Sequence, residues 1–177
     1  MFEYTIRKGN KKDLDAICCL QLYSQEKAFA EITSNELKVP TLKVYTELWT
    51  RRLDSKENDY SFYVAYRDHL LLGFIYARMV VYKGKKIALI KALYVNPTHW
   101  DLGIGYALLK RLYRDIEKQE IEVVSLFILD QNKRAETLYK KFGFKYDSVV
   151  RKIVVHDQEY FLRHMVDRRV INRKENK

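Results

Sequence analysis

The sequence predicts an α/β (α+β) domain, in which helices flank a mixed, mostly antiparallel central sheet. Its 177 residues are 47% apolar and 14% aromatic, which is typical of a globular chain with a sizeable core. Helical and strand periodicities alternate in the order β, α, α, β, β, β, α, β, α, β, β. A loop with two glycines joins an apolar strand to a helix within residues 93–111. We expect a single domain over residues 1–167 and a basic polar tail over residues 168–177.

The N-terminal part of the chain predicts one short strand and two helices. The strand candidate is Tyr4-Thr5-Ile6, and Asn10 can cap a helix over residues 11–31. Pro40 interrupts the chain, and Thr41 then caps a second helix. The expected apolar face of this second helix consists of Leu42, Tyr45, Trp49 and Leu53.

Residues 60–95 predict three strands joined by tight turns. Their aromatic and β-branched content favours a sheet over a helix. Turn residues separate the strands at Asp68-His69 and at Lys83-Gly84-Lys85. The three strands are residues 60–67, 70–82 and 86–95.

The second half of the chain predicts two further helices and three further strands. The helix after the glycine loop fades near Gln119, and residues 123–129 form a continuous apolar run that is typical of a buried strand. Asn132 can cap the next helix, which Gly143 ends. The chain then forms a hairpin of two strands, residues 149–155 and 160–166.

The glycine loop indicates a ligand that carries phosphate. The first turn of a helix has unpaired N–H groups and the positive end of the helix dipole, and Gly103 and Gly105 would let an anion approach it. A P-loop is excluded because Tyr106 and Ala107 follow the second glycine. A dinucleotide fingerprint is excluded because residue 108 is Leu.

Two motifs resemble those of the GNAT acetyltransferase superfamily. Motif A is usually written Q/R-x-x-G-x-G/A after a strand ending in V-x-P, and its matches here are Val95, Asn96, Pro97, Gly103, Ile104, Gly105 and Ala107. Motif B is written N-x-x-A-x-x-x-Y-x-K-x-G-F, and its matches are Asn132, Ala135, Tyr139, Lys141, Gly143 and Phe144. The element order is that of a GNAT domain, and the resemblance covers the chain except its tail. Because Trp100 and Asp101 stand where the family has Gln or Arg and often glycine, we expect a weakened CoA site.

The resemblance implies an N-acetyltransferase in which a primary amine attacks the thioester of acetyl-CoA directly. It implies that loop backbone amides hold the pyrophosphate, at Asp101, Leu102, Gly103, Ile104, Gly105 and Tyr106. The backbone of Leu93, Tyr94 and Val95 would serve the developing oxyanion and the pantetheine amides, and Asn132 would contact the cofactor. Tyr139 would protonate the departing thiolate.

Alternative roles stay open for several of these residues. From spacing alone, Asn132 is a helix cap and Tyr139 packs in the core. The general base is unassigned, because the strand where some family members carry a catalytic Glu has Lys91 instead. The four histidines have little support as the base, and no pattern resembles a metal site or a Ser or Cys triad.

The acceptor amine is also open. The resemblance implies that residues 33–40 form one wall of its site. Small amines, amino acids, aminoglycosides, protein N-termini and lysines all remain candidates. A basic chain without a carboxylate cluster in its expected acceptor loops is a poor trap for polyamines.

The net charge of +10 attracts anions of any kind and does not choose among them. The first rival function is a catalytically weak GNAT-like module that binds CoA or a protein. The second is nucleic-acid binding through the tail, which we rank lower because no basic stripe with interleaved aromatics is visible. No apolar run is long enough to span a membrane, and we expect a cytoplasmic protein. A homodimer is compatible with the resemblance, since family members are often dimers.

Overall fold

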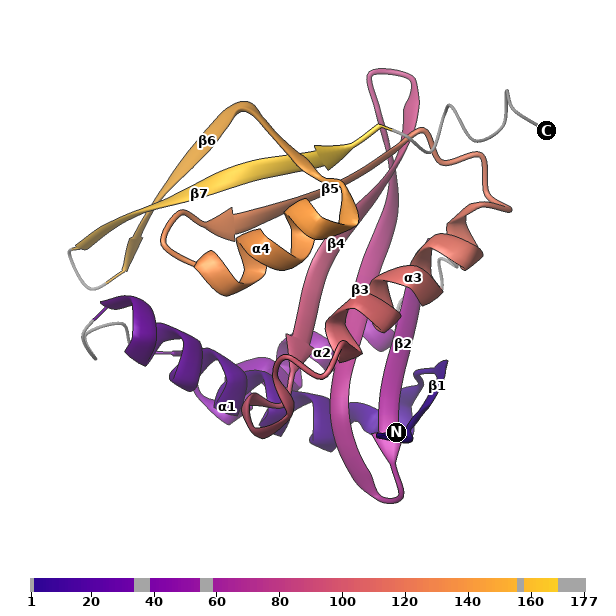
Figure 1. Cartoon of the computed structure of the whole chain (residues 1–177), viewed down its shortest axis with the longest axis vertical. Coiled ribbons are helices and arrows are strands. Elements are labelled where there is room, and N and C mark those ends of the chain that lie inside the picture. The colour runs from indigo at the N-terminus through magenta and orange to yellow at the C-terminus, as the bar shows by residue number, and fades with distance from the viewer. Residues whose placement is uncertain (1, 34–38, 55–58, 156–157, 169–177) are drawn as a thin grey trace.

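The structure, a computed structural model, describes residues 2–33, 39–54, 59–155 and 158–168, and its helices and strands follow the predicted order (Figure 1). The strands are β1 (Thr5–Lys8), β2 (Tyr60–Arg67), β3 (Leu70–Tyr82), β4 (Lys85–Val95), β5 (Val123–Leu129), β6 (Lys145–Val155) and β7 (Gln158–Asp167). The α-helices are α1 (Leu14–Thr33), α2 (Leu42–Leu53), α3 (Ile104–Ile116) and α4 (Lys133–Phe142). Short 3-10 turns lie at Lys11–Asp13 and Pro97–His99.

The strands form one sheet in the order β1-β2-β3-β4-β5-β7-β6. Every neighbouring pair is antiparallel except β4 and β5, which are parallel and are connected through α3. A parallel pair needs a crossover of this kind, whereas tight turns are enough for the antiparallel pairs. The predicted mixed, mostly antiparallel sheet is thus confirmed.

Two hydrophobic clusters cover the two faces of the sheet. On one face, Leu108 and Leu112 of α3 and Tyr139 of α4 are buried against Ile75 and Leu126 of the sheet. We call this the α3 face. On the other face, which we call the α2 face, α1 and α2 pack on the sheet through Ile17, Tyr45, Trp49, Phe62, Phe74 and Tyr76. None of the helices in the described residues is long and apolar enough to cross a bilayer.

The sheet splits between β4 and β5. Residues of the two strands pair only at Ile87–Leu89 with Val123–Ser125. Beyond Leu89 the strands separate, and Figure 1 shows β5 turning away from β4 towards the hairpin of β6 and β7. Among the described residues, the edge of β4 that faces β5 therefore has no neighbouring strand beyond Leu89.

A β-bulge lies at the start of this split. Tyr76 of β3 pairs with Ala92, and Ala77 pairs with Ile90, so Lys91 is the extra residue on β4. Ile90 belongs to the cluster on the α3 face and Ala92 to the cluster on the α2 face. Bulges are common beside functional sites because they redirect a side chain. This bulge places two consecutive residues, Lys91 and Ala92, on the α2 face.

Several details of the prediction need correction. The helix expected over residues 11–31 begins as a 3-10 turn, and α1 itself runs from Leu14 to Thr33, while β7 begins at Gln158 and not at residue 160. Thr41 begins α2 but its side chain makes no capping hydrogen bond, and Leu42 is 43% exposed because the face that packs on the sheet starts only at Tyr45. Strand β6 begins at Lys145 and not at residue 149, since its ladder with β7 continues past a bulge to the Lys145–Val166 pair. The helix α3 ends at Ile116, before Gln119.

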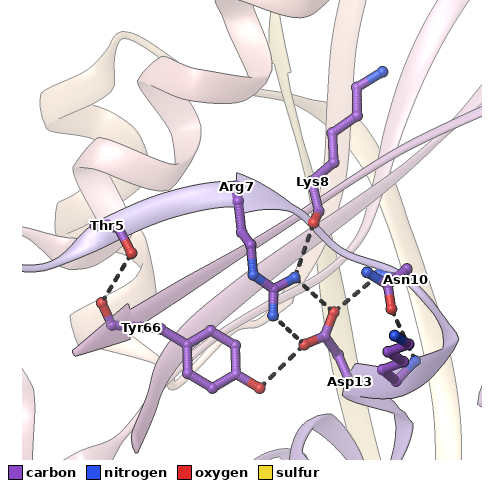
Figure 2. A network of polar contacts seen from close by, with 7 residues as sticks. Thr5, Arg7, Lys8, Asn10, Asp13 and Tyr66 are labelled. Atoms are coloured by element: carbon purple, nitrogen blue, oxygen red, sulfur yellow. Dashed lines mark hydrogen bonds and ion pairs between the residues drawn. The ribbon is translucent and has the colours of Figure 1, made fainter. Parts of the chain in front are cut away.

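A buried carboxylate fixes the N-terminal strand to the sheet (Figure 2). Arg7 donates to the two oxygens of Asp13 over 3.0 and 2.7 Å, and Tyr66 donates to Asp13 over 3.1 Å. The N–H of Asn10 also donates to Asp13, over 2.9 Å, while the Asn10 side chain accepts from Lys12. Burial alone would raise the pKa of Asp13, but the Arg7 and backbone hydrogen bonds outweigh it and lower the pKa.

Candidate functional site

The glycine loop follows the end of β4 and leads into α3. Asp101 and Gly103 both have left-handed backbone angles, with φ of 64° and 79°. A side chain at Gly103 would meet no atom within 4 Å, so glycine is favoured there by conformation and not by space. The first helical hydrogen bond runs from Ala107 N to Gly103 O over 3.0 Å. The amides before Ala107 therefore have no acceptor within the helix and are available to an anion.

Gly105 brings the loop, β4 and α4 together. A Cβ atom at this position would lie 3.0 Å from Leu138 of α4 and 3.6 Å from Val95. The absence of a side chain thus lets α3 approach α4 closely. Tyr106, the next residue, packs its ring against Phe142 of α4 at 5.1 Å between centroids. The two predicted motifs are in contact through these residues.

Trp100 and Asp101, which depart from the family motif, are both bound to Arg134. The Arg134 guanidinium lies 4.2 Å from the centre of the Trp100 ring and donates to Asp101 over 2.7 Å. Trp100 itself donates to the Val95 carbonyl over 2.9 Å. The carboxylate expected to repel the cofactor thus has a cation beside it. Sequence reasoning missed Arg134, although it stands two residues after Asn132 in motif B.

The open edge of β4 presents backbone groups to the split. The N–H of Asn96 donates to Leu72 on β3, so by alternation Tyr94 is directed to β3, while Leu93 and Val95 face the opposite edge. The Val95 carbonyl already accepts from Trp100 and from Ser24. The N–H groups of Leu93 and Val95 are consequently the donors that this edge offers to a ligand.

Tyr94 is held by its side chain on the α2 face. Gln25 donates to the Tyr94 hydroxyl over 2.7 Å, and Tyr45 in turn donates to Gln25. Burial raises the pKa of Tyr94 to about 12, although the Gln25 hydrogen bond acts in the opposite direction. Its backbone belongs to the ladder with β3, so Tyr94 positions the strand, whereas Leu93 and Val95 face the split.

The helix α4 supplies the two motif B candidates. Asn132 accepts from the N–H of Ala135 over 3.0 Å, which confirms that it caps the helix. Tyr139 is 6% exposed and its ring packs against Phe144. Burial, and to a smaller extent the Tyr94 phenol, raises the pKa of Tyr139, so this phenol stays protonated at physiological pH.

These features are compatible with a protein that binds an acyl group on a phosphate-bearing carrier. The loop amides suit the phosphates, the edge of β4 offers donors for a carbonyl oxygen, and Tyr139 of α4 is a protonated phenol. The chain belongs to the acetyltransferase (GNAT) family, whose model matches residues 26–144. It is an N-acetyltransferase that uses acetyl-CoA and acts on an amine.

Relatives and solved structures agree with this assignment. The chain is 26% identical over 167 residues to the spermidine N(1)-acetyltransferase of Thermoplasma acidophilum, covering 88% of this chain and 96% of that protein. It resembles the crystal structure of PaiA N-acetyltransferase from T. acidophilum in complex with coenzyme A, with a TM-score of 0.65, 26% identity and coverage of 92% and 98%. A probable acetyltransferase from Staphylococcus epidermidis has the same fold, with a TM-score of 0.73, 17% identity and coverage of 93% and 98%.

Proposed function

We propose that this enzyme transfers the acetyl group directly from acetyl-CoA to a primary amine in the split between β4 and β5. The observation that carries the proposal is the end of the β4–β5 ladder at Leu89 and Ser125. From there on, the backbone of Leu93 and Val95 faces an edge without a neighbouring strand. The glycine loop lies at the end of the same strand, which suits a carrier with phosphates at one end and a thioester at the other.

In this proposal the cofactor is held mainly by backbone groups. The amides of residues 101–106 bind the pyrophosphate, and the N–H groups of Leu93 and Val95 bind the pantetheine and the thioester oxygen. Asn132 caps α4 with its side-chain oxygen, which leaves its amide nitrogen free to donate to the cofactor. Arg134 offsets the charge of Asp101 beside the phosphates.

The chemical step forms one C–N bond and breaks one C–S bond. The neutral amine attacks the thioester carbonyl, and the negative charge that develops on oxygen is stabilised by N–H donors of β4. Collapse of this intermediate expels the CoA thiolate, which takes a proton from Tyr139. The proton lost by the amine later restores the phenol through solvent. Since its raised pKa keeps Tyr139 protonated, this residue acts as a donor and not as a base.

A screen of amines tests this function. The purified enzyme is mixed with acetyl-CoA and one amine at a time, and free CoA thiol is measured. Because a relative is named as a spermidine N(1)-acetyltransferase, spermidine belongs in the first set, together with amino acids, aminoglycosides and peptide N-termini. Thiol release that depends on an amine supports direct transfer. Thiol release at the same rate without any amine would contradict it.

Several expectations from the sequence stay predictions. These are the domain limits at residues 1–167, the basic tail, the cytoplasmic location and the homodimer. The inter-helix loop that was expected to form a wall of the acceptor site lies largely outside the described residues, at positions 34–38. On the acceptor side of the site, the described residues therefore belong to α2 and the sheet.

A further inference from the structure

Three basic side chains surround the α2 face of the split. They come from three elements that are far apart in the sequence: Arg52 of α2, Lys91 of β4 and Arg151 of β6. We call them the cationic cluster. None of them belongs to the glycine loop or to α4, which lie with α3 on the other face of the sheet.

Lys91 and its neighbour Ala92 share this face because of the β-bulge. Ile90 and Leu93 both pack in the cluster on the α3 face, so the two residues between them, Lys91 and Ala92, are directed to the α2 face. Lys91 lies two residues beyond Leu89, where β4 loses its pairing with β5. Its ammonium group therefore stands at the start of the split and on the side opposite the phosphate loop.

Arg52 is a half-buried cation without a carboxylate partner among the described residues. Its guanidinium lies 4.7 Å from the centre of the Trp49 ring and 5.5 Å from that of Tyr76, the residue paired with Ala92. Arg78, on the same face, differs because it donates to Asp59 over 3.1 Å. Within the described part of the chain, aromatic rings and no carboxylate face the Arg52 charge, so an anion placed beside it would be stabilised.

Arg151 lies on the other side of the split. Its guanidinium is 4.2 Å from the centre of the Phe127 ring of β5. Phe127 comes two residues after Ser125, the last residue of β5 that pairs with β4. Lys91 is thus on β4, and Arg151 packs on a ring of β5, the strand that separates from β4. Arg52 of α2 lies near Tyr76, whose partner on β4 is Ala92, the neighbour of Lys91.

The members of the cluster act on one another. Burial lowers the pKa of Lys91, and the charges of Arg52, Arg151 and Arg78 lower it further. The charges of Arg52 and Arg151 thus disfavour the protonated form of Lys91, and an anion placed among the three would relieve this repulsion. A polycation placed here would instead add to the repulsion.

We propose that the acceptor of this enzyme is an amine that carries an anionic group, a carboxylate or a phosphate, and that the cationic cluster binds this group. The proposal rests on the proposed function, because it places the acceptor on the α2 face of the split. The anionic group lies between Arg52 and Lys91, and the amine extends towards the edge of β4. Spermidine, which has no anionic group, is a poor acceptor on this account.

Matched pairs of acceptors test the proposal. One pair is β-alanine and β-alaninamide, which differ in the carboxylate, and the other is 2-aminoethyl phosphate and ethanolamine, which differ in the phosphate. Binding of each to the CoA-saturated enzyme is measured by calorimetry, and acetylation is measured by thiol release. We expect at least about tenfold tighter binding of the anionic member of one pair, and weaker binding of spermidine than of that member. The pair with the larger ratio tells which anion is preferred.

Variants show whether the cluster causes the preference. In Lys91→Met the preference, measured as the ratio of the Kd of the neutral member to that of the anionic member, should fall about tenfold. In Lys91→Glu the preference should reverse. Arg52→Gln tests a second member of the cluster independently. Lys110→Met removes an exposed lysine of α3, on the other face, and should leave the ratio unchanged. Circular dichroism checks that each variant is folded.

The outcomes separate this inference from the proposed function. Equal binding within both pairs, or tighter binding of spermidine, would overturn the inference even if amines are acetylated. A preference that persists in Lys91→Met and Arg52→Gln would also overturn it. A preference for the anionic member without acetylation of any amine would support the cluster as an anion site and contradict the proposed function.

Discussion

Arg134 of α4 donates a 2.7 Å hydrogen bond to Asp101 of the glycine loop, and its guanidinium stacks on Trp100. The sequence predicts that the Asp101 carboxylate weakens the binding of the CoA phosphates to this loop. The structure supplies a cation to the same place from a second motif. Both side chains are solvent-accessible, so the pair adds little to the stability of the fold. Its effect should appear when a polyanion binds.

Replacing Arg134 should therefore weaken cofactor binding. In Arg134→Met the Asp101 carboxylate faces the phosphates alone, and we expect the Kd for acetyl-CoA to rise about tenfold at low salt, with a smaller effect at high salt. Calorimetric titration measures this. The double variant Arg134→Met/Asp101→Asn should recover part of the affinity. An equal loss of acetyl-CoA affinity in the single and double variants would contradict the idea that Arg134 compensates the charge of Asp101.

Tyr139→Phe should separate chemistry from binding. Loss of the phenolic proton removes the acid for the thiolate, and we expect kcat to fall about 10²-fold or more, while the Kd for acetyl-CoA changes less than about twofold. Steady-state kinetics and calorimetry provide the two values. A parallel loss of both would indicate that Tyr139 only packs in the core.

The pH profile offers a further test of the same residue. Because burial raises the pKa of Tyr139, its protonated form persists above the ordinary titration range of a phenol. The rate should consequently show no fall on the alkaline side up to about pH 10, within the range where the enzyme stays folded. A fall near pH 8 that is absent in Tyr139→Phe would contradict the expected direction of the shift.

The two glycines of the loop should respond differently to substitution. At Gly105 a β-branched side chain would be forced against Leu138, and we expect Gly105→Val to lose cofactor binding by shifting α3 from α4. At Gly103 space is free but φ is 79°, so Gly103→Ala should cost about 1 kcal/mol of stability. Chemical denaturation and acetyl-CoA titration of both variants check this. Unchanged affinity in folded Gly105→Val would refute the phosphate loop.

Acid should release the N-terminal strand. The pKa of Asp13 is lowered in the folded state, so its contribution to stability is complete above the unfolded pKa of about 4 and is lost as the pH falls through the folded pKa. Asp13→Ala should destabilise the fold by about 3 kcal/mol at neutral pH, because Arg7 and the Asn10 N–H lose their acceptor. Denaturation curves at several pH values measure both. In the variant the acid-dependent part of stability should shrink.

The order of elements and the position of both motifs follow from local patterns, and the structure confirms them. Periodicity, the caps at Asn10 and Asn132 and the glycine at position 143 depend on near neighbours in the chain. The contacts that define the split depend on distant partners instead. The pairing of Arg134 with Asp101 crosses 33 residues, and the bulge at Lys91 becomes visible only when β3 and β4 are aligned.

The same limit explains the errors and the missed residues. Residues 145–148 contain charged and polar residues, and they join β6 because β7 offers pairing partners. Arg52 and Arg151 resemble ordinary surface arginines in the sequence. Their common position at the split comes from the packing of α2 and the hairpin on the sheet, which no local pattern contains.

Titration of the purified wild-type enzyme with acetyl-CoA in a calorimeter is the simplest test of the cofactor site, because it requires no knowledge of the acceptor. We expect saturable binding at one site per chain, with a Kd on the order of micromolar. Binding of this kind would show that Trp100 and Asp101, together with Arg134, form a competent loop. Absence of binding in a folded sample would contradict it, since the loop would then be only a turn that starts α3.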